Sequence, residues 1–205
     1  MGEEATMAVR RSSDSDTASA ILDVAERLAQ TRGFNAFSYA DVAAELGITK
    51  PALHYHFPGK AELGEALVTR YTARFDEALE TIDGSELNAA GKLAAYVDLY
   101  AQVLARDRMC LCGMLAADYH TLPEPMRHSI IRFFDRSETW LTGVVDHGRH
   151  AGTLQVDGAS REVAQMILGA LEGAMLVART YRDPERFDTS AKRLLGEITT
   201  PSRQN

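Results

Sequence analysis

Apolar residues recur at every third or fourth position along most of the chain from residue 17 onward, which is the spacing of amphipathic α-helices. The first of these stretches begins at Thr17 and ends at Gly33, because glycine readily takes the conformation that terminates a helix. Its apolar positions are Ile21, Leu22, Val24, Ala25, Leu28 and Ala29. The pattern predicts an all-α protein whose first helix spans residues 17–32.

Two short helices follow, each with a recognisable start. Ser38 and Asp41 form a capping-box pattern, in which each side chain can bond to the backbone of the other residue. Gly47 ends this second helix, and Thr49 can cap a third helix over residues 50–57, where Pro51 is tolerated in the first turn. Two short helices joined by a tight glycine-containing turn form a helix-turn-helix, whose second helix can enter the major groove of DNA.

The third helix has an unusual surface. Leu53 and Phe57, four residues apart, are its only clear core positions, so its remaining side chains face outward: Lys50, Ala52, His54, Tyr55 and His56. Amine, phenol and imidazole groups can contact phosphates, a lysine can also reach a guanine edge, and an alanine methyl can touch a thymine methyl. Each base contact of this kind discriminates by about 1–3 kcal/mol. The helix is therefore a candidate DNA-reading element.

The segment 37–57, together with Lys60-Ala61-Glu62-Leu63, resembles the TetR-like repressors, and the resemblance covers about residues 17–67. It implies an N-terminal three-helix DNA-binding head, a larger helical ligand-binding and dimerisation domain, and about nine helices in total. It also implies that Tyr55 and Lys60 contact the DNA backbone and that Lys50 and Ala52 meet bases. Two positions depart from the family pattern: His54 stands where tyrosine is commoner, and Gly59 stands where serine or asparagine usually caps the next helix.

The partner implied for the head is double-stranded operator DNA, read by a homodimer as a palindrome with recognition helices about 34 Å apart. The candidate DNA-contacting residues are Ser38, Tyr39, Thr49, Lys50, Pro51, Ala52, His54, Tyr55, His56 and Lys60.

The chain divides into four predicted regions. Residues 1–16, rich in serine, acidic and small residues, are expected to form a disordered tail. Residues 17–62 form the helix-turn-helix domain, residues 63–198 form the helical ligand-binding and dimerisation domain, and residues 199–205 form a C-terminal tail. Within the larger domain, helices are predicted over about 60–81, 88–105, 126–148 and 163–181, and the resemblance adds one over 184–198.

Helices 88–105 and 126–148 carry many aromatic residues and are candidates to line a pocket for a small-molecule effector of unknown identity. The same side chains equally suit plain core packing. The candidate ligand-binding residues are Tyr96, Tyr100, Cys110, Cys112, Met114, Tyr119, His120, Phe134, Trp140 and Met166.

Helix 163–181 contains small residues that let a neighbouring helix approach closely. The resemblance implies that the last two helices of each protomer form a four-helix bundle across a two-fold axis, although packing within one chain would explain the glycines equally well. The candidate interface residues are Gly169, Gly173, Ala174 and Val177.

Cys110 and Cys112 allow three interpretations. Small buried thiols are the simplest. Alternatively, Arg106 and Arg108 lower the pKa of a thiol, which then senses oxidants or electrophiles, as in some of the similar regulators. Metal binding with His120 is the third, but cysteines two apart on a helix diverge by about 200°, so it needs an irregular backbone or a second subunit. We therefore predict no metal site.

Composition narrows the function classes. A formal net charge of −7 argues against a protein that coats nucleic acid, so DNA contact must come from a local surface.

We find no membrane-length apolar run, no secretory leader and no disulfide framework, so a cytoplasmic location is expected. No phosphate loop, nucleophile elbow or paired-histidine motif indicates an enzyme or a cofactor. The rival interpretation is a helical ligand-binding protein that does not bind DNA.

Overall fold

The computed structural model describes the backbone of residues 2–199 and the side chains of residues 14–199. Over this part of the chain it contains helices and no strand, which confirms the all-α class. The α-helices are α1 (Gly2–Arg32), α2 (Tyr39–Leu46), α3 (Lys50–His56), α4 (Lys60–Asp83), α5 (Ala89–Leu104), α6 (Leu111–Ala117), α7 (Glu124–His150), α8 (Ser160–Tyr181) and α9 (Glu185–Thr199). Single 3₁₀ turns at Phe34–Ala36 and Tyr119–Thr121 follow α1 and α6.

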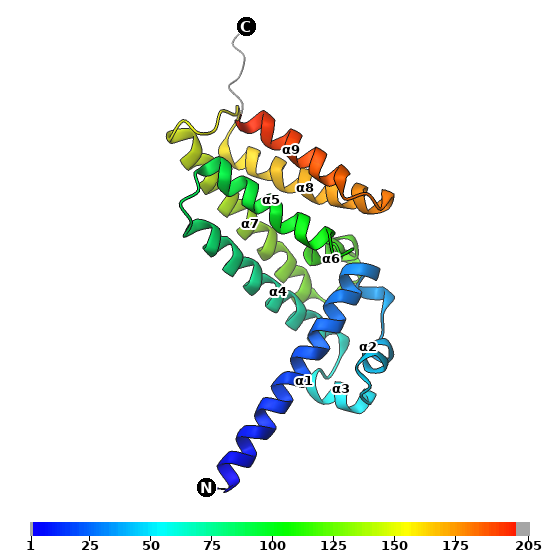
Figure 1. Cartoon of the computed structure of the whole chain (residues 1–205). Helices are drawn as coiled ribbons and strands as arrows, with labels where there is room; N and C mark the ends of the chain where they lie inside the picture. The colour runs from blue at the N-terminus through cyan, green and yellow to red at the C-terminus, as the bar shows by residue number, and fades with distance from the viewer. Residues whose placement is uncertain (1, 200–205) are drawn as a thin grey trace.

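The head is formed by α2 and α3 packed beside α1 (Figure 1). The predicted capping box is present: the Asp41 amide donates to the Ser38 hydroxyl, and the Asp41 carboxylate accepts from the Ser38 amide at 2.7 Å. Gly47 ends α2 with φ of 65°, and the Thr49 hydroxyl caps α3 by accepting from the Ala52 amide at 3.3 Å. These local bonds place α3 where the sequence predicts it.

The body is a bundle in which α7 packs against α4, α5 and α8, and α9 covers α8 (Figure 1). An aromatic cluster fills its centre: the ring of Phe133 lies 5.7 Å from that of Tyr71 and 5.0 Å from that of Phe75. The fully buried Tyr96 stacks on Trp140 at 5.4 Å. Since α4 belongs to the bundle and also begins directly after the head, it connects the two.

The expected N-terminal tail differs from what the structure shows. Residues 2–16 continue α1 without a break, and this part of the helix extends past the rest of the molecule (Figure 1). Once the docked turns between Thr17 and Arg32 have formed, each further residue adds to an existing helix without a new nucleation step, and this segment contains neither glycine after Gly2 nor proline. The expected C-terminal tail comprises residues 199–205. Thr199 is the last residue of α9, and the rest of the expected tail lies outside the described residues.

By length and composition alone, α8 is long and apolar enough to cross a membrane, which differs from the expectation that no such run exists. It is the one helix of the described residues that meets this criterion. Its position between α7 and α9 accounts for part of its apolar character, because it is a core helix of the bundle.

Candidate nucleic-acid interface and effector cavity

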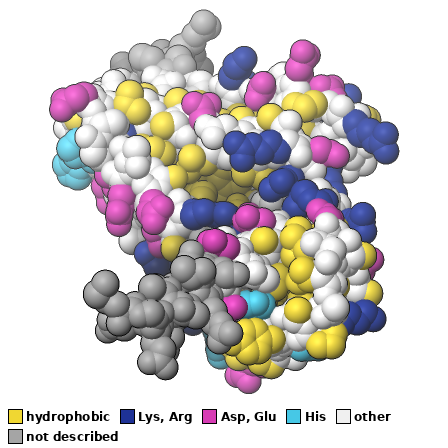
Figure 2. Space-filling view, turned by 60° about the horizontal axis from the view of Figure 1, so that its bottom comes forward, with side chains coloured by type: hydrophobic (Ala, Val, Ile, Leu, Met, Phe, Trp, Pro, Cys, Tyr) yellow, Lys and Arg dark blue, Asp and Glu magenta, His cyan; other side chains and the backbone are white. Residues whose placement is uncertain are grey.

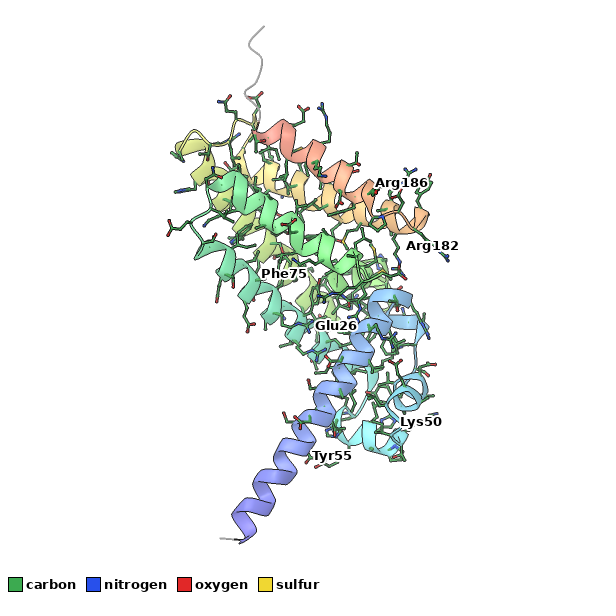
Figure 3. All side chains as sticks on the ribbon, viewed as in Figure 1. Glu26, Lys50, Tyr55, Phe75, Arg182 and Arg186 are labelled. Atoms are coloured by element: carbon green, nitrogen blue, oxygen red, sulfur yellow. The ribbon has the colours of Figure 1, made fainter. Side chains whose placement is uncertain are left out.

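The outer surface of α3 carries the side chains predicted to meet DNA. Leu53 is fully buried beneath the helix, whereas Lys50, Pro51, His54 and Tyr55 are exposed. The Tyr55 side chain is 74% exposed, although it is large and aromatic. Figure 3 shows Lys50 and Tyr55 on the outer side of the head, away from the body. No packing among the described side chains explains an exposed aromatic residue here, so this surface is a candidate to meet a partner.

Two of the predicted contact residues also hold the head together. The Tyr39 hydroxyl donates to the Phe57 carbonyl at 2.9 Å, and its ring lies 4.7 Å from that of His54. Burial raises the pKa of Tyr39 to about 12, so its hydroxyl keeps the proton that this bond uses. His54 Nδ1 lies 2.9 Å from the Pro58 carbonyl. A carbonyl can only accept, so Nδ1 carries the hydrogen of this bond.

The structure places Lys60 differently from the other candidates. Its ammonium donates to the Phe37 carbonyl and lies 4.8 Å and 4.5 Å from the ring centroids of Phe34 and Phe37. Burial lowers its pKa. Lys60 therefore joins the start of α4 to the core of the head, and a contact between its ammonium and DNA phosphate would have to share these bonds.

One face of α8 is apolar and uncovered. The exposed side chains Met166, Leu176, Val177 and Tyr181 lie along this helix, and a methyl group added at Gly169 or Gly173 would meet nothing within 4 Å. The glycines therefore do not serve a close approach within the described chain, which removes the intramolecular explanation for them. Ala174, which follows Gly173 on the same helix, is half-buried.

A cavity of about 330 Å³ lies where α1, α4 and α5 meet, closed by Cys110 before α6 and by Met175 of α8. Its lining is partly apolar, with Tyr71, Phe75 and Tyr100, and partly charged, with Glu26 and three arginines, one of which, Arg74, lies 6.0 Å from the Tyr71 ring centroid. Figure 2 shows the surface hollowed between head and body, with apolar side chains in the hollow and basic and acidic side chains beside it.

Of the predicted ligand-binding residues, Tyr100 and Cys110 line this cavity. The others lie elsewhere: Tyr96 and Cys112 are buried, Tyr119 and His120 lie in the turn after α6, Met114 contacts Arg179, and Met166 is on the open face of α8. Phe134 packs against Phe133, and the Trp140 indole donates to Asp83 at 2.9 Å beside a separate groove. Helix α7 does not line the cavity, because its aromatic residues fill the space between α4 and α5.

Several lining residues were missed by the sequence analysis. From α1 come Glu26 and Gln30, from α4 come Arg74 and Phe75, and the turn after α5 adds Arg106 and Arg108. A signal for two of them is present in the sequence, because Glu26 and Gln30 interrupt the apolar stripe of the first helix one turn apart, and both are buried. A polar residue within a buried stripe requires a partner.

Glu26 finds its partners on α4. Its carboxylate accepts from Arg74 at 2.6 Å and from Arg70 at 3.0 Å, and the side chain is only 7% exposed. Arg70 also pairs with Asp23 at 2.8 Å. Figure 3 shows Glu26 and Phe75 at the junction of α1 and α4. These ion pairs couple the helix that carries the head to the helix that enters the body.

A second connection reaches the C-terminal end of α1. Arg179 of α8 donates to the Gln30 carbonyl at 3.2 Å and to the Thr31 carbonyl. The last carbonyls of a helix lack partners within the helix and carry partial negative charge, so a guanidinium stabilises them. A movement of α8 relative to α4 would therefore be transmitted to α1.

Two family models match the chain. The model described as "Bacterial regulatory proteins, tetR family" matches residues 21–67, and the model described as "Tetracyclin repressor-like, C-terminal domain" matches residues 89–194. The chain belongs to the TetR family. The predicted resemblance is thereby confirmed, and the match extends to the larger domain, where the sequence analysis carried over architecture alone.

Known proteins are similar over nearly the whole length of this TetR-family chain. The HTH-type transcriptional repressor NemR of Escherichia coli (strain K12) is 24% identical over 201 residues, 95% of this chain and 100% of NemR. A TetR-family regulator from Agrobacterium tumefaciens superimposes with a TM-score of 0.88 at 30% identity, over 91% of this chain and 100% of that one. AibR in complex with isovaleryl coenzyme A and operator DNA has a TM-score of 0.71 at 21% identity, over 90% of this chain and 99% of AibR.

The cysteines of this TetR-family regulator are buried neutral thiols. Cys110 is 3% exposed and Cys112 is fully buried. Burial, followed by the nearby Glu172 carboxyl, raises the pKa of both thiols well above the usual 9.0. Neither Arg106 nor Arg108 is among the causes that act on the pKa of either thiol, so the lowered pKa expected from these arginines is not found. No group of three or more histidine, cysteine, aspartate or glutamate side chains lies close enough to hold a metal ion within the part of the chain that the structure describes.

We expect both thiols to react slowly in the folded protein. At pH 8, modification by a disulfide reagent such as 5,5′-dithiobis(2-nitrobenzoate) should be at least about tenfold slower than in 6 M urea, because the thiolate is the nucleophile. Since the folded pKa values are raised, folded protein keeps protons that the unfolded chain loses, so the free energy of unfolding should fall as pH rises above 9.0. Equal modification rates in the folded protein and in 6 M urea would favour the thiol-sensing alternative.

Proposed function

We propose that this chain is a homodimeric repressor that binds a palindromic operator through α3 and is released by a small-molecule inducer. The observation that carries the proposal is the outward surface of α3, where Tyr55 is 74% exposed beside an exposed Lys50 on a rigidly capped helix-turn-helix. NemR, which is similar over nearly the whole chain, is a transcriptional repressor, and AibR has been solved with operator DNA.

A homodimer is supported by the uncovered face of α8. Apolar side chains that are about half exposed, at Leu176, Val177 and Tyr181, are unusual on one side of a core helix, and the open space above Gly169 and Gly173 admits a close neighbour. A second copy of α8 supplies the complementary surface, because a two-fold axis brings the same patch onto itself. We also propose a cytoplasmic location, because operator DNA would be bound there.

Induction is supported by the position of the cavity. It lies between α1, α4 and α5, so a bound molecule contacts the helices that join the head to the body. A ligand shifts an equilibrium only by its differential affinity for two states. We propose that the inducer binds better to the dimer whose recognition helices are wrongly spaced, and so releases the operator.

The first test is fluorescence-anisotropy titration of a labelled duplex from the DNA upstream of its own gene, with a scrambled duplex as the control and salt fixed, because phosphate contacts are salt-sensitive. Saturable binding at least about a hundredfold tighter than to the scrambled duplex is expected. If neither this duplex nor selection from genomic DNA yields a preferred sequence, the protein is instead a helical ligand-binding protein.

The dimer is tested separately. Val177→Glu places a charge on the open face of α8 and should convert the protein to a monomer in sedimentation velocity, with loss of operator binding. Leu87→Glu is the matched control, since Leu87 is 46% exposed but lies between α4 and α5. A Val177→Glu protein that sediments as the wild-type dimer would place the interface elsewhere.

A further inference from the structure

The charged wall of the cavity is predominantly basic. Three arginines line it, Arg74, Arg106 and Arg108, against one acidic residue, Glu26. The Glu172 carboxyl, which does not line the cavity, interacts with the lining residue Cys110, and burial raises the pKa of this carboxyl, which disfavours a second negative charge there. The cavity therefore presents an excess of positive charge next to its apolar side.

Two of these arginines are not used by the chain. Arg106 and Arg108 make no side-chain hydrogen bond and no ion pair with any residue whose side chain the structure describes, whereas Arg74 is held by Glu26. The turn that carries them is fixed: the Asp107 amide donates to the Leu104 carbonyl at 2.9 Å, and Asp107 has a left-handed φ of 54°. Two guanidinium groups are thus placed beside an apolar cavity without an internal partner.

A buried acceptor without a partner is a second feature of the residues that line the cavity. Gln30 is 2% exposed and lines the cavity, and its amide nitrogen donates to the Met109 carbonyl at 3.0 Å. Its carbonyl oxygen Oε1 is buried and has no hydrogen-bond partner among the residues that the structure describes. An unpaired buried acceptor costs about 1–3 kcal/mol, so a donor on a ligand, such as a hydroxyl group, would stabilise the complex here.

The apolar lining residues indicate the rest of the ligand's structure. Phe75, Tyr71 and Tyr100 present aromatic surface, with Leu99, Val103 and Met175 around them. A volume of about 330 Å³ lies at the lower end of the range of small-molecule sites. The complementary molecule is small, has an apolar body and carries a negative charge at one end.

We propose that the cavity binds a small carboxylate with an apolar, preferably hydroxylated body, and that the bound carboxylate draws Arg74 away from Glu26. The second part rests on the proposed function, since it describes how binding would release DNA. Guanidinium groups bind carboxylates with two parallel hydrogen bonds, so a ligand carboxylate and Glu26 compete for the same donors. When Arg74 turns to the ligand, α1 keeps the two ion pairs that Asp23 and Glu26 make with Arg70 and loses the pair between Glu26 and Arg74.

The chemistry is tested by isothermal titration calorimetry of the full-length dimer without DNA. The probes are 4-hydroxyphenylacetate and octanoate, each compared with its neutral amide of the same length. Both carboxylates should bind, and at least one should bind about tenfold or more tighter than its amide. Equal affinities for acid and amide, or no saturable binding of any probe up to about 10 mM, would overturn the proposal.

The arginines are tested with a charge-matched pair of variants. Arg106→Gln/Arg108→Gln should reduce carboxylate affinity at least about tenfold and leave amide affinity unchanged. Arg132→Gln/Arg136→Gln removes two exposed arginines of α7 that do not line the cavity and should bind the probes as the wild type does. Equal losses in the two variants would show a general effect of net charge instead of a site.

The exchange at Arg74 is tested with Glu26→Gln. Removal of the competing carboxylate should tighten carboxylate binding severalfold and reduce the effect of the ligand on operator affinity. Asp76→Asn, which removes the partner of Arg136 on the same helix α4, is the control. Weaker or unchanged carboxylate binding by Glu26→Gln, with a wild-type melting profile, would contradict the exchange. Ligand binding is measured without DNA. If the protein binds the carboxylates but no operator, the proposed function is wrong and the proposed carboxylate site still stands.

Discussion

Replacing Lys50 and Tyr55 together by alanine is expected to weaken operator binding by at least about a hundredfold, with less than about 0.5 kcal/mol change in the free energy of unfolding. Both side chains are exposed on α3, so little packing is lost. A base contact contributes about 1–3 kcal/mol to discrimination, and a lost phosphate contact weakens binding to all sequences. The free energies of the two lost contacts add, so the two reductions in affinity multiply to about a hundredfold.

The measurement is an anisotropy titration at several salt concentrations. Loss of the Lys50 charge should also reduce the slope of log affinity against log salt by about 1 if this amine contacts a phosphate. Lys192→Ala removes an exposed lysine of α9 and serves as the charge-matched control. If the double variant binds the operator as tightly as this control, α3 is not the reading element.

Phe133→Ala should lower the free energy of unfolding by about 3–5 kcal/mol, a large loss for a single substitution. Phe133 is 1% exposed, and its ring contacts those of Tyr71, Phe75 and Phe134. Truncation removes these contacts and leaves a void where α4, α5 and α7 meet. For a chain of this size, the loss corresponds to a melting temperature lower by about 6–20 °C.

Thermal unfolding at one fixed protein concentration measures this effect, because the stability of a dimer depends on concentration. Phe134→Ala is the matched control: it removes the same side chain one position further along α7, where the residue is only half-buried. The smaller loss expected for Phe134→Ala separates packing at the centre of the bundle from any general effect of helix propensity. A larger loss for Phe134→Ala would contradict the packing described.

Helix ends were largely predictable from the sequence because they depend on residues that are near one another in the chain. Ser38 and Asp41 form a capping box whatever the tertiary fold, and Gly47 takes its left-handed φ within one turn. The start of α5 follows from Asn88, whose side chain caps the Gly91 amide at 2.9 Å. The exposed α3 surface was predictable for the same reason, since a short helix whose only clear core positions are Leu53 and Phe57 has to expose its other faces.

The cavity was not predictable because it is set by how helices pack together, and periodicity shows only which face of a helix is buried. Phe75 and Phe133 both belong to apolar faces, yet only the ring from α4 borders the cavity. Lys60 shows a second limit: the family pattern implies a DNA contact, but the rings of Phe34 and Phe37 lie within reach of its side chain and hold it. The pKa values of the cysteines likewise depend on burial, which local sequence does not determine.

The single anchor of α3 has a consequence for divergence after gene duplication. Because Leu53 alone is fully buried in this helix, the exposed Lys50 and Tyr55 can change without disturbing any core, and such changes alter stability by only about 0.5 kcal/mol. The proposed effector cavity, by contrast, is lined by side chains that also support the bundle, such as Tyr71 and Tyr100. Duplicated copies of this regulator are therefore free to acquire new operators early and are held to related effectors for longer.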